Sequence, residues 1–364
     1  MRIGGLIPLL GAALLPLVAS KATAAEAAAL QRLTETGQCP RCDLSGADLS
    51  GMRLMSADLS GADLRGASLR KTVLFRANLA GADLRGADIE KASLGRVNLS
   101  GADLSGLDLR EARLGHAELG GAKLVGSDLG GSMLEHADLQ GADLAGASLI
   151  GASLRYAKLG GARLARATLK EADLRGLDLR QAASLEGADL SHARLEGAKL
   201  DGLDLSSNRF DSADLQGAGL SQVTLRSVSL QKANMRKADL SHSDLEGADL
   251  RGAIVKSVKL QGAVLRSANF EEASVGGNLV GSDFSGSRLV RADLTGANLK
   301  DARFVGADLT QASFATCNLY GADFSRAKLK QTNFRGANLR GAVFDGTDLA
   351  GADFEDAMDG PNAR

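Results

Sequence analysis

The chain has 364 residues, more than one compact hydrophobic core usually holds, so either several domains or a repeat array is expected. It contains 45 Gly, 10 Phe, 2 Tyr, 4 Pro and no Trp, too few aromatic residues for an ordinary globular core of this size. The net charge of −1 indicates neither a nucleic-acid-binding surface nor affinity for an anionic membrane.

Residues 1–24 have the features of a Sec-type signal peptide. Residues 1–2 are a short basic start, residues 3–18 are apolar apart from Gly and Pro, and residues 22–24 form a small-x-small site. We therefore expect cleavage before Ala25 and a periplasmic or secreted protein. The alternative is an inner-membrane anchor that stays uncleaved. The length of the apolar stretch disfavours it, because residues 3–18 are fewer than the roughly 20 residues needed to span a bilayer.

Residues 25–41 form a short segment ahead of the main pattern. Residues 25–36 are rich in alanine, with Leu30 and Leu33 on one side, and predict a short helix. The CxxC sequence Cys39-Pro40-Arg41-Cys42 follows it.

From residue 42 to residue 356 the chain repeats every five residues, as in Ala47-Asp48-Leu49-Ser50-Gly51. This period excludes an α-helix, because residues five apart are rotated by about 140° around a helix axis. Short extended pieces joined by corners fit instead. The central apolar residue and the small residue two before it point inward, and the residue between them points outward. The last two residues turn the corner, and glycine is frequent at the second because positive φ is cheap for it.

These repeats resemble the A(D/N)LXX motif of the pentapeptide-repeat proteins over about 310 residues of the chain. The resemblance implies an all-β fold, a right-handed quadrilateral β-helix with four repeats in each coil, and hence about 16 coils. Because the ends of a solenoid leave its core open, we expect residues 25–36 to cover the first coil. Residues 357–364 remain as a short tail, which leaves the last coil weakly covered and open to homodimer formation.

Three local features modify the array. From residue 299 onward, Leu and Phe alternate at the central position, as in Phe304 and Phe314, which predicts stacked Phe columns on two opposite interior faces. One residue is added within 180–184, and one is removed within 276–278. We interpret these as a corner bulge and a tightened corner. The alternative is a bend that shapes a docking surface.

For Cys39 and Cys42 we predict a disulfide, because no βαβ pattern follows that would suit a redox enzyme and the expected compartment is oxidising. Zinc needs four ligands, and the remaining cysteine, Cys317, lies about 13 coils away. Cys317 is interpreted as a small inward filler that replaces alanine.

The outward polar residues do not single out a catalytic or metal site. His116, His136, His192 and His242 occupy corner positions, and His116 and His136 should stack, since 20 residues make one coil. We interpret both as solvated, although a weak metal site is an alternative. The many Asp residues share one outward slot beside a turn, where Asp suits local backbone bonding.

The preferred function is therefore a non-enzymatic exported scaffold that binds an unknown protein partner along its faces. No cofactor, small-molecule substrate, nucleic acid or membrane span after cleavage is expected. The resemblance also suggests a DNA mimic that binds gyrase, as quinolone-resistance proteins do. The leader and the outward Arg residues count against it. A carbohydrate-active β-helix enzyme is a third alternative, disfavoured because no insertion is longer than one residue.

Overall fold

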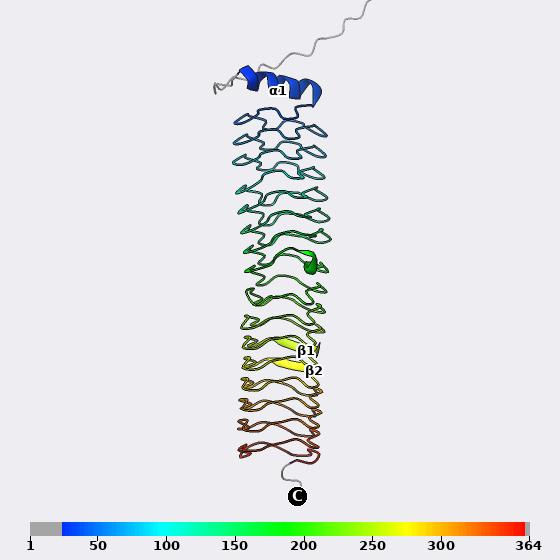
Figure 1. Cartoon of the computed structure of the whole chain (residues 1–364), viewed down its shortest axis with the longest axis vertical. Coiled ribbons are helices and arrows are strands. Elements are labelled where there is room, and N and C mark those ends of the chain that lie inside the picture. Colours follow the sequence, from blue (N-terminus) through cyan, green and yellow to red (C-terminus); the bar gives the residue numbers. More distant parts are fainter. Residues whose placement is uncertain (1–23, 361–364) are drawn as a thin grey trace, which may run out of the picture.

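The computed structural model describes residues 24–360, which form one elongated rod of stacked coils (Figure 1). Helix α1 (Ala24–Thr36) lies across the N-terminal end of the rod, and it begins one residue before the predicted helix. The prediction of a signal peptide falls almost wholly on residues 1–23, outside the described residues. The last four residues of the predicted tail, 361–364, also lie outside them.

Each regular coil has 20 residues and bonds to the next coil through a parallel backbone ladder. Asp143 is bridged to Lys123 on one side and to Arg163 on the other. The N–H of Leu144 donates to the carbonyl of Arg163 at 2.8 Å, and the N–H of Asp143 donates to the carbonyl of Ala122 at 2.9 Å. Most extended pieces are thus paired on both sides, and the first and last coils carry the sheet edges at the two ends of the rod.

The corners are β-turns that use positive φ. The N–H of Ala147 donates to the carbonyl of Leu144 at 3.0 Å, and Gly146, the third residue of this turn, has φ 65°. A third residue with positive φ is typical of a type II turn. Other residues take the same conformation at this slot, such as His116 (φ 58°), because the ladder on both sides holds the corner in place.

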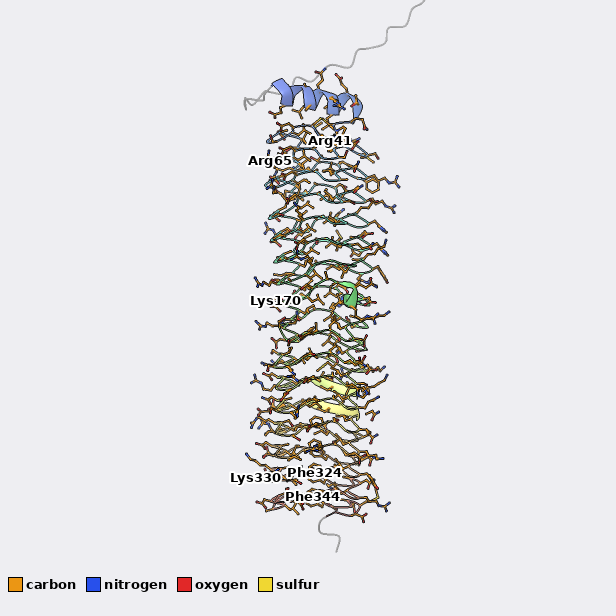
Figure 2. The ribbon with its side chains drawn as sticks, in the orientation of Figure 1. Arg41, Arg65, Lys170, Phe324, Lys330 and Phe344 are labelled. Carbon is orange, nitrogen blue, oxygen red and sulfur yellow. A yellow bond between two sulfur atoms is a disulfide. The ribbon has the colours of Figure 1, made fainter. Side chains whose placement is uncertain are left out.

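The inward and outward assignments made from the sequence are confirmed. Leu144 and Ala142 are fully buried, while Asp143 between them is partly exposed. The interior is therefore built almost wholly from Leu, Ala and Phe, and side chains such as Arg65, Lys170 and Lys330 lie on the outside (Figure 2).

The predicted phenylalanine columns are also confirmed. Phe324 stacks on Phe304 and on Phe344, with ring centroids 5.0 and 5.2 Å apart, and Phe334 stacks on Phe314 at 5.3 Å. Rings of the two columns meet edge to face, as Phe324 and Phe334 do at 87°. Both arrangements are favourable for aromatic pairs, and together they fill the C-terminal third of the interior.

The added residue near position 182 is accommodated by a 3-10 turn, η1 (Leu179–Gln181). The ladder offset changes there from 20 to 21 residues, as in Arg163↔Ser184. Asn208 enters the adjacent interior, where its Nδ2 donates to the carbonyls of Leu185 at 2.6 Å and Ala188 at 3.1 Å. The side-chain amide thus bonds to carbonyls beside the widened corner.

The removed residue near position 277 is accommodated by two short strands. Strand β1 (Ile254–Lys259) pairs in parallel with β2 (Ser274–Asn278), with a register shift between Val255 and Val258. Gly277 has φ 122°, and a Cβ at this position would lie 2.3 Å from the carbonyl oxygen of Val258. Only glycine fits so close a backbone approach. The stack of coils continues through both irregular corners (Figure 1).

Within residues 24–360 the ladder lacks a small number of its expected bridges, and most of the gaps adjoin an enlarged inward residue. Leu107, Leu177 and Leu203 occupy the small inward slot, which is alanine in most other repeats. We attribute the gaps to overpacking, since the longer side chain holds neighbouring coils apart on that side. The missing bridges are Asp88 to Asp108, Ser93 to Arg113, Lys158 to Asp178 and Ser184 to Asp204.

Candidate interaction surfaces

The outward aspartates bond to their own corners. Oδ1 of Asp204 accepts from the backbone N–H of Ser206 at 3.0 Å and from its hydroxyl at 2.6 Å. These hydrogen bonds, the hydroxyl first, lower the pKa of Asp204 below its ordinary value. In its charged form the carboxylate therefore stabilises the turn. A carboxyl group that is held in its charged form does not suit a general acid.

Many outward arginines are neutralised by an aspartate two residues earlier. Arg65 donates from Nε and Nη2 to both carboxylate oxygens of Asp63, the shortest distance being 2.5 Å. The same geometry recurs at Asp173 and Arg175. The hydrogen bond from Arg175 is the main reason that the pKa of Asp173 is lowered, although burial acts against it. Such exposed pairs contribute about 0–1 kcal/mol each, so their main effect is on the charge of the surface.

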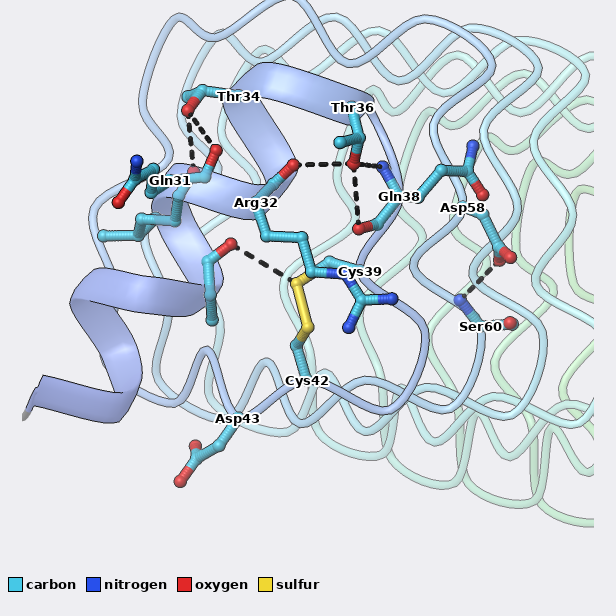
Figure 3. The surroundings of a disulfide bond; sticks show 12 residues. Gln31, Arg32, Thr34, Thr36, Gln38, Cys39, Cys42, Asp43, Asp58 and Ser60 are labelled. Atoms are coloured by element: carbon cyan, nitrogen blue, oxygen red, sulfur yellow. Dashed lines mark hydrogen bonds between the residues drawn. A yellow bond between two sulfur atoms is a disulfide. The ribbon is translucent and has the colours of Figure 1, made fainter.

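Helix α1 and the CxxC sequence meet at the N-terminal end of the rod (Figure 3). Leu33 is buried against the first coil, and Leu30 packs beside it. Cys39 and Cys42 are joined by a disulfide with Cα atoms 5.4 Å apart. The Cys39 sulfur also lies 3.4 Å from the carbonyl oxygen of Ala29, in contact with the helix.

Three rings stack along one corner edge of the rod. His116 and His136 are parallel with centroids 4.8 Å apart, as expected, and Tyr156 continues the stack at 4.9 Å from His136. Tyr156, which is 61% exposed, was not foreseen, although its position 20 residues after His136 could have revealed it. His192 and His242 also lie exposed at corners with positive φ.

Five arginines around this edge form no ion pair with any described residue. Arg76, Arg96 and Arg155 lie at corners whose preceding outward slot holds no aspartate, so the usual partner is missing. Arg53 and Arg113 occupy that outward slot themselves, and the same slot in the coils beside them holds no aspartate either. Arg76 instead lies over the Phe75 ring, 5.4 Å from its centroid, and Arg155 lies over the Tyr156 ring at 5.3 Å. The five are Arg53, Arg76, Arg96, Arg113 and Arg155.

A hollow of about 870 Å³ opens beside the ladder gap at Asp88 and Asp108. Its lining includes Ile89, yet its charges are mostly satisfied: Arg70 pairs with Asp88 at 2.8 Å, and Arg110 pairs with Asp108 at 2.6 Å. A single lining arginine, Arg113, forms no ion pair with a described residue, so the hollow presents no cluster of unpaired cations.

Two further results concern the described part of the chain. No group of three or more His, Cys, Asp or Glu side chains within residues 24–360 could hold a metal ion. No helix in the same range is long and apolar enough to cross a membrane. Cys317 is buried, burial raises the pKa of its thiol to about 12, and the thiol donates to the carbonyl of Leu294 at 2.9 Å.

Comparison with solved structures finds several repeat proteins, all at low TM-scores. QnrB1, a plasmid-mediated fluoroquinolone resistance protein, is 19% identical with a TM-score of 0.27, covering 64% of this chain and 88% of that one. HetL from Nostoc sp. strain PCC 7120, a protein involved in heterocyst differentiation regulation, is 28% identical with a TM-score of 0.16, covering 89% and 94%. A protein of the Arabidopsis thaliana thylakoid lumen is 32% identical with a TM-score of 0.16, covering 34% and 72%. No match is found among curated proteins.

The family comparison is decisive because it covers most of the array. The model for pentapeptide repeats matches in eight copies, which extend from residue 41 to residue 356 with short interruptions. Proteins of this family adopt a right-handed quadrilateral β-helix and are generally structural or binding proteins. The chain belongs to the pentapeptide-repeat family.

Proposed function

We propose that this protein is an exported, non-enzymatic scaffold that binds a protein partner along the faces of its rod. One observation carries the proposal: the interior is uniform, whereas the outward columns differ from each other. Packing alone accounts for Leu, Ala and Phe inside. It does not require the ring stack of His116, His136 and Tyr156, which is exposed and spans three coils.

The proposed architecture is a rod of about 16 coils closed at one end and open at the other. At the closed end, α1 and the Cys39–Cys42 disulfide would act as a cap, supported by the burial of Leu33. At the open end, Phe344 and Phe354 are only partly buried and Met358 is 48% exposed. A homodimer through this coil would cover them.

Export is proposed from the sequence of residues 1–24, and a disulfide of the kind seen at Cys39 and Cys42 suits an oxidising compartment. A gyrase-binding DNA mimic of the quinolone-resistance type is the alternative. It would need a cytosolic protein with an acidic surface, whereas many carboxylates here are paired with arginine, as Asp63 is with Arg65.

A photo-crosslinking scan would test the scaffold proposal. A photoreactive residue is placed at the outward position of each side of one coil, at Asp88, Ser93, Asn98 and Asp103, in the mature chain. Extract of the exported fraction is then irradiated. We expect one adduct mass on one side, which recurs when the probe is moved by 20 residues along that side. Absence of any adduct, or adducts that do not follow the 20-residue spacing, would contradict partner binding along a face.

A further inference from the structure

The unpaired arginines and the stacked rings lie on one continuous surface. We call it the basic stripe. It comprises the outward residue at every twentieth position from 53 to 153, together with the two corner residues that follow each of them, from 55–56 to 155–156. Its cations are Arg53, Arg76, Arg96, Arg113 and Arg155, and its single carboxylate is Glu135. The stripe ends in the next coil, where Asp173 appears on the side and pairs with Arg175.

The stripe also carries exposed apolar groups between the arginines. Met55 is 58% exposed, Met133 is 40% exposed and Tyr156 is 61% exposed, while Phe75 is partly exposed beneath Arg76. Stacking on Phe75 and Tyr156 holds two of the guanidiniums over the rings, which reduces the side-chain entropy lost when a ligand binds.

The composition of the stripe favours a protein partner over a nucleic acid or a polysaccharide. It contains Arg, Met, Tyr and Phe but no Lys. Arginine, methionine and aromatic residues are enriched in protein interfaces, whereas lysine is depleted there. The guanidinium group also recognises carboxylates through paired hydrogen bonds, and five unpaired guanidiniums therefore call for acidic groups on the partner.

We propose that the basic stripe binds an extended acidic segment of a partner protein, one in which carboxylates alternate with apolar side chains. The proposal rests on the scaffold function proposed above and names the face and the chemistry of its partner. Five coil steps of about 4.8 Å give a stripe of roughly 24 Å, which matches about seven residues of extended chain. This is smaller than a standard protein interface, so we expect micromolar affinity.

Two double variants distinguish binding at the basic stripe from a general effect of the protein's net charge on binding. R76E/R96E reverses two arginines of the stripe, and R166E/R326E reverses two arginines on the opposite edge that also form no ion pair with described residues. All four have positive φ at the second corner position, between 56° and 59°. Glutamate already occupies this slot at Glu111 and Glu171, so both double variants should fold. Equal melting temperatures would verify this.

Random twelve-residue peptides displayed on phage are selected on the mature wild-type chain, and the enriched peptides are labelled for fluorescence polarisation. We expect enriched sequences with net negative charge and apolar residues. Their affinity should fall at least tenfold for R76E/R96E and less than twofold for R166E/R326E, and Y156A should weaken binding without lowering the melting temperature.

Four outcomes would overturn the proposal. Neutral or basic enriched peptides would remove the charge argument, and equal affinity for wild type and R76E/R96E would place the peptide elsewhere on a scaffold that still binds protein. Heparin or duplex DNA that binds the stripe as tightly as the peptides would identify a polyanion site. If no peptide is enriched and the crosslinking scan also finds no adduct, the proposed scaffold function fails as well.

Discussion

Asp108 lies one coil after Asp88, yet no ladder bridge joins these two described residues, and the intervening inward residue is Leu107 in place of alanine. Ala112, on the same coil, is 9% exposed, whereas most inward alanines are buried almost completely. We attribute the missing bridge to local overfilling of the interior by Leu107.

The first prediction follows from that overfilling. Leu107→Ala should lower the free energy of unfolding by less than about 1 kcal/mol or raise it, because it relieves overpacking. Leu109→Ala, at a regular inward position, should cost about 2–5 kcal/mol. Denaturant unfolding measures both, and hydrogen exchange should show new protection at Ile89 in Leu107→Ala. Equal losses for the two variants would show that Leu107 packs without strain.

A second prediction concerns the two sides of one extended piece. Leu144→Asp places an unpaired carboxylate in the interior and should cost several kcal/mol. Asp143→Ser should change stability by less than about 1 kcal/mol, since Asp143 is partly exposed and its bond to the N–H of Ala145 can be taken over by a hydroxyl. Thermal melting of the two variants is the measurement. Similar melting temperatures would mean that the faces are reversed.

Acid should destabilise the rod. The folded-state pKa values of Asp204 and Asp173 are lowered, so each carboxylate contributes stability that is present above its unfolded pKa of about 3.9 and is lost as the pH falls through the folded value. We expect the melting temperature to fall steadily as the pH decreases from about 5 to about 2. NMR titration of the two carboxyls would test the cause. A melting temperature that is constant or rises over this range would contradict it.

The disulfide prediction concerns only the N-terminal end. Reduction of Cys39–Cys42 should cost about 2 kcal/mol or less, because the closed loop is short. Coils of a solenoid contact only their neighbours, so hydrogen exchange should increase in α1 and the first coil and stay unchanged near Phe324. In the folded protein Cys317 should resist alkylation, because its thiol is buried and its pKa is about 12. Faster hydrogen exchange throughout the rod after reduction, or three free thiols in exported protein, would contradict a disulfide that stabilises only the N-terminal end.

Export is the last prediction. Cell fractionation and N-terminal sequencing should find the mature chain in the periplasm or the medium, with an N-terminus near Ala25. The full-length chain in the cytosol would contradict this and would favour gyrase as the target, which a supercoiling assay with purified protein could then examine.

The sequence by itself determined the repeating parts of the structure. A five-residue period assigns Leu144 and Asp143 to opposite faces, and the 20-residue coil that the family resemblance implies places His116 on His136 and Phe304 on Phe324. Such inferences succeed because each repeat has the same local geometry, so that a position in the period fixes a direction in space. The same reasoning could have placed Tyr156 on the stack.

Only the tertiary structure decided the features that depend on contacts between coils. The gap at Leu107 reflects whether neighbouring coils can absorb a larger side chain, and the approach of Gly277 to Val258 follows from the shifted register. The basic stripe likewise depends on neighbouring coils, since Asp143 of the preceding coil pairs with Arg163, whereas no described carboxylate of a neighbouring coil pairs with Arg113. Packing tolerance and ion pairing are set by distances between atoms of separate coils, and those distances are not contained in the repeat period.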